Sequence, residues 1–319
     1  MNHPVTVAMA IYKPQMYWLR EELISLHRQT FQNFELAVWN DDPDDDYDYV
    51  SFFCKNLPNI QCRFFHGEIN LGSTGAFAQL TQRIGTNYIA YCDQDDIWEP
   101  DKLQLLYDYM CDNTVNMVCS DMYVIDQKSH VLSDSITTIR PHYFFYHGNN
   151  PFKYLLAKNF VTGCTMMVKT EIAQKALPFP KEITHDWWIA LCASASGQIG
   201  VINKPLIQYR IHDTNQTLIL KGVVDKKSYY TMKILMYERM MQIIERRFGN
   251  SIYRQDIQRH GLWAQRRKSY FKNPTFLGGI YLWRMRSINK NITYFELFLP
   301  CMPGFLFSVL VKMIQNGKL

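Results

Sequence analysis

Short apolar runs alternate with amphipathic stretches along the first part of the chain. Four of these runs have the length and apolar content of buried strands: VTVAMAIY (5–12), FELAVWN (34–40), IQCRFFH (60–66) and YIAYC (88–92). The stretches between them carry apolar residues at helical spacing: MYWLREELISLHRQT (16–30), residues 49–57 and NLGSTGAFAQLTQRIG (70–85). Strands that alternate with helices predict an α/β fold with a doubly wound parallel sheet.

The pattern continues to about residue 220 and then changes. We expect further elements as follows: a helix at 102–112, a strand at 117–126, a strand and a helix within 160–177, a helix at 185–197 and an extended segment at 199–212. Residues 1–220 hold 16 Lys and Arg against 24 Asp and Glu, a net charge of −8, whereas residues 221–319 hold 18 against 5, a net +13. This change predicts an α/β domain over 1–220 and a basic, mainly helical region over 221–319.

The composition is that of a folded, intracellular protein. Apolar residues make up 47% of the 319 positions and aromatic residues 14%, which is enough for a sizeable core. The eight Cys show no CxxC motif and no metal-ligand spacing. The first residues, MNHPVTVAMAIYKP, lack the basic and long apolar regions of a signal peptide. We therefore expect a reducing, cytoplasmic setting.

Acidic clusters follow two of the predicted strands. Asp93 and Asp95 stand at alternating positions after the fourth strand, so their carboxylates point to the same side. Such ligands suit Mg²⁺ or Mn²⁺, which commonly bridge protein carboxylates to substrate phosphates. The alternative is a solvated acidic turn before the next helix. Asp41 and Asp42 follow the second strand, and ligands of parallel sheets bind at this edge.

The segment THDWW, at the start of the helix 185–197, combines a carboxylate with an imidazole and two indoles. A carboxylate near apolar rings can act as a general base, so Asp186 is a candidate for that role. Trp187 and Trp188 are candidate contacts to a sugar. The alternative is structural, with Asp186 capping the helix and both rings in the core.

His212, in YRIHDTNQT, is either another contact to sugar or acceptor, or part of an ordinary surface loop.

Taken in order, seven segments resemble the family 2 glycosyltransferases, which have the GT-A fold, an α/β fold with a Rossmann-like mixed sheet. They span about residues 4–217: AIYKP, QTFQNFEL before NDDPDDD, NLGSTGAF, CDQDDIWEPDKL, NFVTGCTMMVK, HDWW and KPLIQYRIHDTNQT. QDDIW and YRIH are most similar to the rhamnosyltransferase-type branch that builds bacterial surface polysaccharides. Each segment alone is weakly specific, and their common order makes the resemblance specific.

The resemblance implies roles for individual residues. Asp93 and Asp95 match the DxD motif that binds a divalent cation and the nucleotide diphosphate, and Asp186 matches the catalytic base. The nucleotide-sugar site would also include these residues: Ala10, Tyr12, Asp41, Asp42, Asn70, Gly72 and Gln94. The chain departs from the family in two places. His185 stands where Glu is common, and DDPDDD replaces Asp-Asp-Gly-Ser, so either Asp41 or Asp42 could contact the base.

These roles imply an inverting glycosyltransferase that uses Mg²⁺ or Mn²⁺. Its donor would be a UDP- or dTDP-linked sugar, and its acceptor a hydroxyl of a lipid-linked glycan in O-antigen or capsule synthesis. One alternative is a sugar-phosphate nucleotidyltransferase, although no Gly-rich loop with Arg and Lys follows the first strand. Another is a non-enzymatic protein that binds membranes or nucleic acid through its basic region. Nucleic-acid binding would leave the acidic clusters without a role, so we expect no such partner.

The basic region contains an uncharged apolar stretch, LFLPCMPGFLFSVLV (297–311). Its 15 residues fall short of the ~20 that span a bilayer, and they include two Pro and a Gly. We expect it to lie in an anionic membrane surface, flanked by Arg284, Arg286, Lys290 and Lys312. The alternative is that it packs as a helix on the catalytic domain or in a dimer. The resemblance implies a cytoplasmic protein, peripheral on the inner face of the cytoplasmic membrane.

Overall fold

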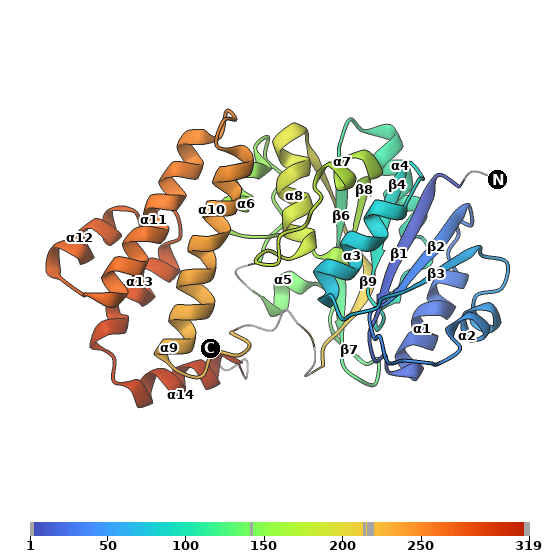
Figure 1. Cartoon of the computed structure of the whole chain (residues 1–319), viewed down its shortest axis with the longest axis horizontal. Coiled ribbons are helices and arrows are strands. Elements are labelled where there is room, and N and C mark those ends of the chain that lie inside the picture. The colour runs from blue at the N-terminus through green and yellow to red at the C-terminus, as the bar shows by residue number, and fades with distance from the viewer. Residues whose placement is uncertain (1–2, 141–142, 213–214, 216–219, 316–319) are drawn as a thin grey trace. The chain divides into compact units, whose positions relative to one another are not determined.

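The chain forms two compact units, Met1–His212 and Asp213–Leu319. The structure is a computed structural model that describes residues 3–140, 143–212, 215 and 220–315. Figure 1 shows the order of the elements along the chain. Strands occur in the first unit, and the described elements of the second unit are all helical.

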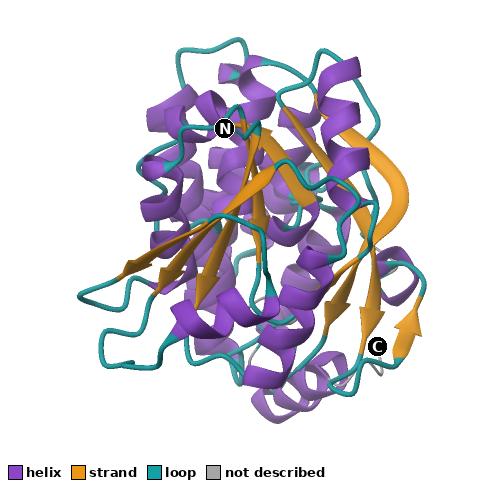
Figure 2. Cartoon of the chain, turned by 90° about the vertical axis from the view of Figure 1, so that its right-hand side faces the viewer, coloured by secondary structure: helices purple, strands orange, loops and turns teal. Residues whose placement is uncertain are grey.

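Among the described residues of the first unit, nine strands form one twisted sheet (Figure 2). Their bounds are β1 Val5–Ile11, β2 Phe34–Asn40, β3 Cys62–His66, β4 Tyr88–Cys92, β5 Ile97–Trp98, β6 Met117–Ile125, β7 Val131–Ser133, β8 Met166–Lys169 and β9 Ile199–Arg210. The order across the sheet is β3-β2-β1-β4-β8-β6-β9-β5, with β7 paired to β6.

The sheet is mixed, as the resemblance to the GT-A fold implies, whereas the alternation of strands and helices alone predicted a parallel one. β1 to β4 run parallel, but β8 is antiparallel to both β4 and β6, and β5 is antiparallel to β9. The described part of the connection from β6 to β8 has short helices and no long crossover helix. The chain therefore re-enters the sheet at the end where β6 left it, and apolar periodicity carries no signal for that direction.

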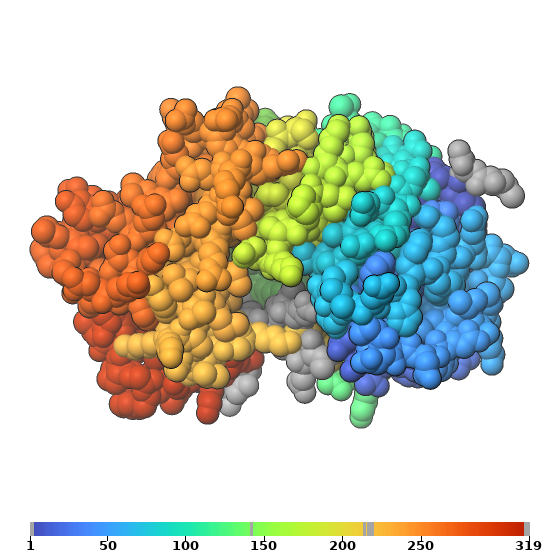
Figure 3. All heavy atoms as spheres, in the orientation of Figure 1, coloured from blue at the N-terminus to red at the C-terminus, as the bar shows by residue number. Residues whose placement is uncertain are grey.

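Helices cover both faces of the sheet. Side chains on both faces of β1 and β2 are therefore buried. The helical elements of this unit are α1 Met16–His27, α2 Tyr49–Asn56, α3 Gly72–Arg83, α4 Lys102–Asp112, α5 Ile136–Ile139, α6 Pro151–Ala157, the 3₁₀ turn η1 Gly163–Thr165, α7 Thr170–Lys175 and α8 His185–Ser196. α3 packs against α7 and α8, and Figure 3 shows α3 beside α7 on one face of the unit.

The register of the parallel strands brings their carboxyl ends to one edge. Ile11 at the end of β1 pairs with Asn40 at the end of β2. Met9 of β1 pairs with Cys92 at the end of β4. The residues that follow β1, β2 and β4 therefore lie at the same edge of the sheet, where ligands of such folds bind.

The second unit is a helical bundle with its own core. Its elements are α9 Lys226–Tyr229, the π-helical turn η2 Tyr230–Leu235, α10 Met236–Phe248, α11 Arg254–Lys272, α12 Phe276–Arg284, α13 Lys290–Phe298, the 3₁₀ turn η3 Leu299–Cys301 and α14 Gly304–Gln315. A buried ion pair joins α11 to α13, with Arg267 Nη2 2.7 Å from Glu296 Oε1. The Tyr229 hydroxyl donates to the same carboxylate oxygen at 2.9 Å.

The apolar segment 297–311 does not form one helix, because the turn η3 separates α13 from α14. α14 buries Phe307 and Val311 in the core of the second unit and leaves Phe305 and Val309 exposed. One side of the segment is thus packed on protein of its own unit, and only its outer side is open. Among the described helices, none is long and apolar enough to cross a membrane.

Candidate active site at the carboxyl edge of the sheet

The loop after β4 is held in shape by Arg210, the last residue of β9. Arg210 has no exposed surface. Its guanidinium donates from Nε to the Asp95 carbonyl at 2.7 Å and from Nη2 to Glu21 Oε2 at 2.9 Å. Its backbone N–H donates to Asp96 Oδ1 at 2.9 Å. Arg210 was not among the site residues expected from the sequence. The available signal was an arginine at the end of an apolar strand, because a buried guanidinium is tolerated only when its donors find partners.

Three side chains converge under this loop. The ligand atoms of Asp93, Asp96 and Cys164 lie within 4.8 Å of one another. The Cys164 thiol lies beside both carboxylates, and burial next to them raises its pKa well above the usual value. A neutral thiol is a poor ligand for a hard cation, so the carboxylate oxygens are the ligands on offer. Asp96 Oδ2 has no hydrogen-bond partner among the described residues.

His212 lies against the second carboxylate of the DxD motif. Its Nε2 is 2.8 Å from Asp95 Oδ2, and the Trp18 ring packs beside the imidazole at 5.0 Å between centroids. The sequence offered His212 as a contact to sugar or acceptor, or as part of a surface loop. The structure places its imidazole against a carboxylate that is predicted to hold a metal ion.

Carboxylates crowd this edge and perturb one another. Burial, together with the nearby Asp95 and Asp186 carboxylates, raises the pKa of Asp93 to about 7. Asp186 lies in the first turn of α8, where its Oδ1 accepts the backbone N–H of Trp187 at 2.6 Å. The predicted metal ligands and the predicted base therefore act on one another across one site.

A buried lysine offsets part of this negative charge. Lys102, at the start of α4, is fully buried, and its Nζ donates to the Cys164 carbonyl at 2.5 Å. The same nitrogen lies 3.2 Å from the centre of the Trp98 ring. Burial lowers the pKa of Lys102 to about 8, so the ammonium remains mostly charged at pH 7. It places a cation directly beneath the acidic loop.

The ends of β1 and β4 are tied together by Gln94. The Tyr12 N–H donates to Gln94 Oε1 at 2.8 Å, and Gln94 Nε2 donates to the Tyr12 carbonyl at 3.1 Å. The Gln94 amide is thus engaged by the backbone of β1, which makes it a brace for the site edge. Ala10 is half-buried two residues earlier, and the Tyr12 ring is largely open to solvent.

Asp41 and Asp42 have different surroundings, which the sequence could not distinguish. The Asp41 carboxylate accepts the N–H groups of Leu71 at 3.0 Å and Gly72 at 2.8 Å, so it holds the start of α3. Asp42 is also buried, but its carboxylate accepts only a long bond of 3.4 Å from the Asp44 N–H among the described hydrogen bonds. Of the two, Asp42 keeps more capacity to contact a ligand.

The turn before α3 depends on a glycine. Gly72 has a φ of +69°, and no atom lies within 4 Å of where a Cβ would stand. A residue with a side chain would be strained there, although the space is open. The exposed Asn70 stabilises the turn, because its Oδ1 accepts the Gly72 N–H at 3.1 Å.

The two tryptophans of THDWW differ in exposure. Trp188 is only 4% exposed, and its indole N–H donates to the Ala176 carbonyl at 2.7 Å. It offers no ring face to a sugar and packs in the core, which is the alternative given above for both tryptophans. Trp187 is half-buried and donates to the Leu155 carbonyl at 2.7 Å. We keep only Trp187 as a candidate sugar contact.

His185 occupies an enclosed site beside Asp186. Its ring packs on Phe77 at 4.2 Å between centroids and on Tyr91 at 5.3 Å. Burial lowers the pKa of His185, which favours the neutral form of the imidazole. Gly163 makes room for the ring, because a Cβ there would lie 2.7 Å from His185 Nε2.

A comparison with models of protein families identifies the family of this chain. The model of the family described as Glycosyl transferase family 2 matches residues 7–177, more than half of the 319 residues. The chain belongs to glycosyltransferase family 2. This membership makes it an enzyme that transfers glycosyl groups, and it decides against the other function classes that the sequence left open.

Relatives of this glycosyltransferase come from several organisms. An uncharacterised glycosyltransferase of Methanocaldococcus jannaschii is 27% identical over 240 residues, 73% of this chain and 80% of that protein. Another, from Rickettsia bellii, is 27% identical over 232 residues, but the chain spans only 32% of its length. Escherichia coli WfgD, a UDP-Glc:α-D-GlcNAc-diphosphoundecaprenol β-1,3-glucosyltransferase, is 24% identical over 216 residues, 67% of this chain and 79% of WfgD.

Two similar solved structures confirm the GT-A fold class. One is S. aureus TarS 1–349 in complex with UDP-GlcNAc, with a TM-score of 0.60 and 13% identity over 98% of this chain and 92% of that one. The other is the mannosyltransferase PcManGT of Pyrobaculum calidifontis with GDP-Man and Mn²⁺, with a TM-score of 0.55 and 14% identity over 93% and 84%. At these identities the likeness concerns the fold alone.

Proposed function

We propose that this glycosyltransferase moves a sugar from a UDP- or dTDP-linked donor to a hydroxyl of a lipid-linked glycan, with inversion at the anomeric carbon. The observation that supports this best is the meeting of Asp93, Asp95 and Asp186 at one edge of the sheet, with His212 on Asp95. The bound UDP-GlcNAc in TarS and the diphosphoundecaprenol acceptor in the name of WfgD support the donor and acceptor classes. The product would enter a bacterial surface polysaccharide such as O-antigen or capsule.

The residues present fit a divalent cation. Asp93 and Asp95 would supply carboxylate oxygens, and the His212 imidazole would orient Asp95 through its contact with Oδ2. Oxygen ligands suit Mg²⁺ and Mn²⁺, and PcManGT contains Mn²⁺. When bound, the ion would neutralise the charge that develops on the leaving diphosphate.

Asp186 carries the proton transfer in this proposal. It accepts the proton of the acceptor hydroxyl while that oxygen attacks the anomeric carbon of the donor. The bond between the anomeric carbon and the acceptor oxygen forms as the bond to the diphosphate oxygen breaks. Because attack comes from the face opposite the leaving group, one displacement inverts the configuration. Gly163 lies beside both His185 and Asp186.

The nucleotide would lie along the ends of β1 and β2. Ala10 and Tyr12 would line the base pocket, and Asp42 would contact the base or ribose, because Asp41 is engaged by the start of α3. Trp187 would face the acceptor sugar. We further propose that residues 1–220 act as the catalytic domain and residues 221–319 attach the enzyme to the cytoplasmic face of the membrane, where a lipid-linked acceptor lies.

The test is a transfer assay with the full chain and Mn²⁺. UDP- and dTDP-linked sugars are screened with a polyprenyl-diphosphate-linked N-acetylhexosamine, and the anomeric configuration of the product is read by NMR. We expect transfer from one donor with inversion. Retention of configuration would contradict the roles assigned here, and so would the release of pyrophosphate from a nucleoside triphosphate and a sugar 1-phosphate without any sugar transfer.

A further inference from the structure

The helix α12 of the second unit exposes apolar side chains from its first residue. Phe276 is 84% exposed and Leu277 63% exposed. Tyr281 and Trp283, farther along the helix, are also exposed. Single exposed apolar residues are common on protein surfaces, but a group of four on one short helix marks an interaction surface.

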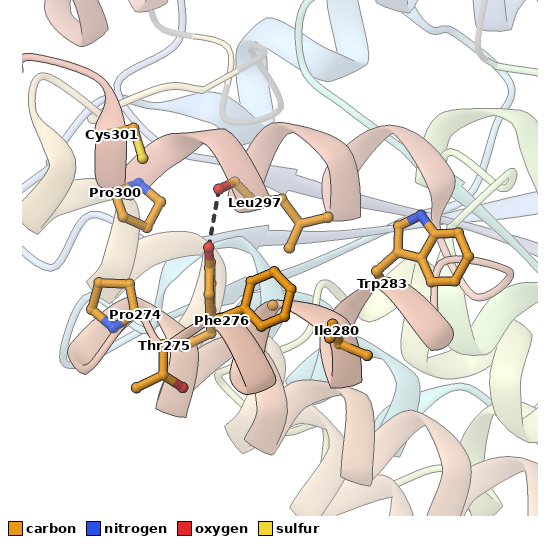
Figure 4. A pocket seen from close by; sticks show the side chains of 10 residues that line it. Pro274, Thr275, Phe276, Ile280, Trp283, Leu297, Pro300 and Cys301 are labelled. Carbon is orange, nitrogen blue, oxygen red and sulfur yellow. Dashed lines mark hydrogen bonds between the residues drawn. The ribbon is translucent and has the colours of Figure 1, made fainter.

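A pocket opens beside this helix. It has a volume of about 530 Å³ and lies between α12 and the end of α13. Figure 4 shows Phe276, Ile280 and Trp283 along α12, facing Leu297 of α13. The Leu297 carbonyl accepts the Tyr270 hydroxyl at 3.2 Å, so this polar pair in the wall is satisfied. The lining that remains is largely apolar and suits a hydrocarbon chain.

Positive charge surrounds the pocket. Residues 257–295 hold eight Lys and Arg and no Asp or Glu. Arg267 and Lys268 form ion pairs with Glu296 and Glu238, which leaves six of the eight for an anionic partner. The Arg286 guanidinium lies 3.7 Å from the centre of the Trp283 ring, and that of Arg266 lies 4.8 Å from the Tyr281 ring. Two exposed rings of α12 are therefore each held beside a cation, one from α11 and one from the turn after α12.

This combination selects one kind of occupant. Charge complementarity requires an anionic partner, and a second copy of the chain that packed through this same face would bring positive charge against positive charge. A nucleic acid is anionic but would leave the apolar pocket empty. An anionic lipid surface satisfies both features, because its phosphates face the cations and its chains meet the apolar residues.

We propose that α12 docks this enzyme on an anionic bilayer, with Phe276 and Leu277 among the acyl chains and one chain in the pocket between α12 and α13. The biological reason for such docking rests on the proposed function, in which the acceptor is lipid-linked. The docking itself is argued only from the apolar residues, the pocket and the cations of the second unit. It moves the main membrane contact away from α14, whose inner side is packed in the core. The segment 297–311 contributes only its first residues, Leu297 to Cys301, to the wall of the pocket.

The first test measures co-sedimentation of the full chain with vesicles of phosphatidylglycerol and phosphatidylcholine at low salt. The variant is Phe276→Ser with Leu277→Ser, and the control is Ile252→Ser, which changes a residue that is 89% exposed in the same unit. Burial of the Phe276 or the Leu277 side chain among acyl chains should raise the affinity of the protein for vesicles by about tenfold. We expect the double variant to lose at least tenfold in vesicle affinity and the control to match the parent.

A second pair of variants separates charge at α12 from net charge. Arg284→Gln with Lys290→Gln removes two exposed cations next to the pocket, and Arg239→Gln with Arg246→Gln removes two from α10. Each cation near an anionic surface contributes about fivefold, so the first pair should lose ~25-fold and the second much less. Equal losses in the two pairs would show a delocalised charge effect and overturn the assignment to α12.

The pocket itself is tested by Gly279→Leu. A Cβ at Gly279 would lie 3.4 Å from the Tyr270 ring and 3.7 Å from Leu297, at ordinary contact distances. The added side chain should fill the pocket and lower vesicle affinity, whereas unchanged affinity would remove the pocket from the proposal. A parent that ignores phosphatidylglycerol vesicles at low salt would overturn the whole proposal.

Two controls show whether a loss of vesicle binding comes from the α12 surface or from another change in the protein. UDP binding with Mn²⁺ is measured on every variant and should equal that of the parent, so a loss of vesicle binding cannot be attributed to the site in the first unit. Sedimentation equilibrium gives the oligomeric state. If the Phe276→Ser, Leu277→Ser protein changed its oligomeric state while still binding vesicles, the face would be an interface between copies and the membrane assignment would be wrong.

Discussion

Replacing Arg210 with Met should release the acidic loop and weaken the fold of the first unit. Met keeps much of the apolar stem but offers no hydrogen-bond donor. Besides the Asp95 carbonyl and Glu21, the Arg210 guanidinium donates to the Asp126 carbonyl at 3.2 Å and to Ser129 Oγ at 2.9 Å. All four of these hydrogen bonds would be lost together.

The size of the effect follows from this geometry. Removing one partner of a buried ion pair costs ~3–5 kcal/mol, because the other charge stays buried and unpaired. The Glu21 side chain is 22% exposed and also accepts the Ser129 hydroxyl, so water and Ser129 offset part of the loss. We therefore expect Arg210→Met to lower the free energy of unfolding by ~3 kcal/mol. The displaced loop should also reduce Mn²⁺-dependent UDP affinity by at least tenfold.

The assay combines urea unfolding with calorimetry of UDP binding in Mn²⁺. Arg267→Met is the matched control, because Arg267 also forms a buried pair with a glutamate, Glu296, but in the second unit. It should lose similar stability and keep the UDP affinity of the parent. If Arg210→Met showed the parent's UDP affinity and unfolding midpoint, Arg210 would not be the residue that holds the loop.

Three further predictions concern the base and two titrating groups. Asp186→Asn should lower kcat by ~10²–10⁴ in initial-rate measurements while UDP affinity in calorimetry stays unchanged, and near-parent turnover would place the base elsewhere. Because the pKa of Asp93 is about 7, protons should compete with Mn²⁺, so its apparent affinity should rise with pH up to about 7 and then level; a flat calorimetric profile from pH 5.5 to 8 would contradict this. Burial and Arg259 lower the pKa of His260 to about 4, so its contribution of ~3 kcal/mol should be complete above pH 6.5 and lost as pH falls to 4. Urea midpoints of the parent and His260→Gln should converge over that range, and parallel curves would refute the assignment.

The strands were predictable where an apolar run ends in charged or polar residues. The expected strands 34–40 and 88–92 coincide with β2 and β4, because each run stops at an acidic cluster. The short strands β5 and β7 were missed, since two or three residues give no periodic signal. The direction of β8 depends on how the chain returns from β6, which no local pattern records.

The site was predictable where its residues follow strands and hidden where it depends on distant pairing. Asp93 and Asp95 could be placed at the ligand edge from the strand before them. The engagement of Asp41 could not, because its partners Leu71 and Gly72 reach it only through the fold. Arg210 is 115 positions from Asp95, and nothing local indicates that their contact exists.

The central claim is that the carboxylates after β4 hold a divalent cation that binds the nucleotide diphosphate of the donor. Calorimetry of UDP and dTDP binding tests it most directly, with the parent and Asp95→Ala each measured in Mn²⁺ and in EDTA. We predict that the parent binds at least one of the two nucleotides in Mn²⁺ and loses this binding in EDTA, and that Asp95→Ala binds weakly in both. Equal nucleotide affinity of the parent in Mn²⁺ and EDTA, unchanged in Asp95→Ala, would contradict the claim.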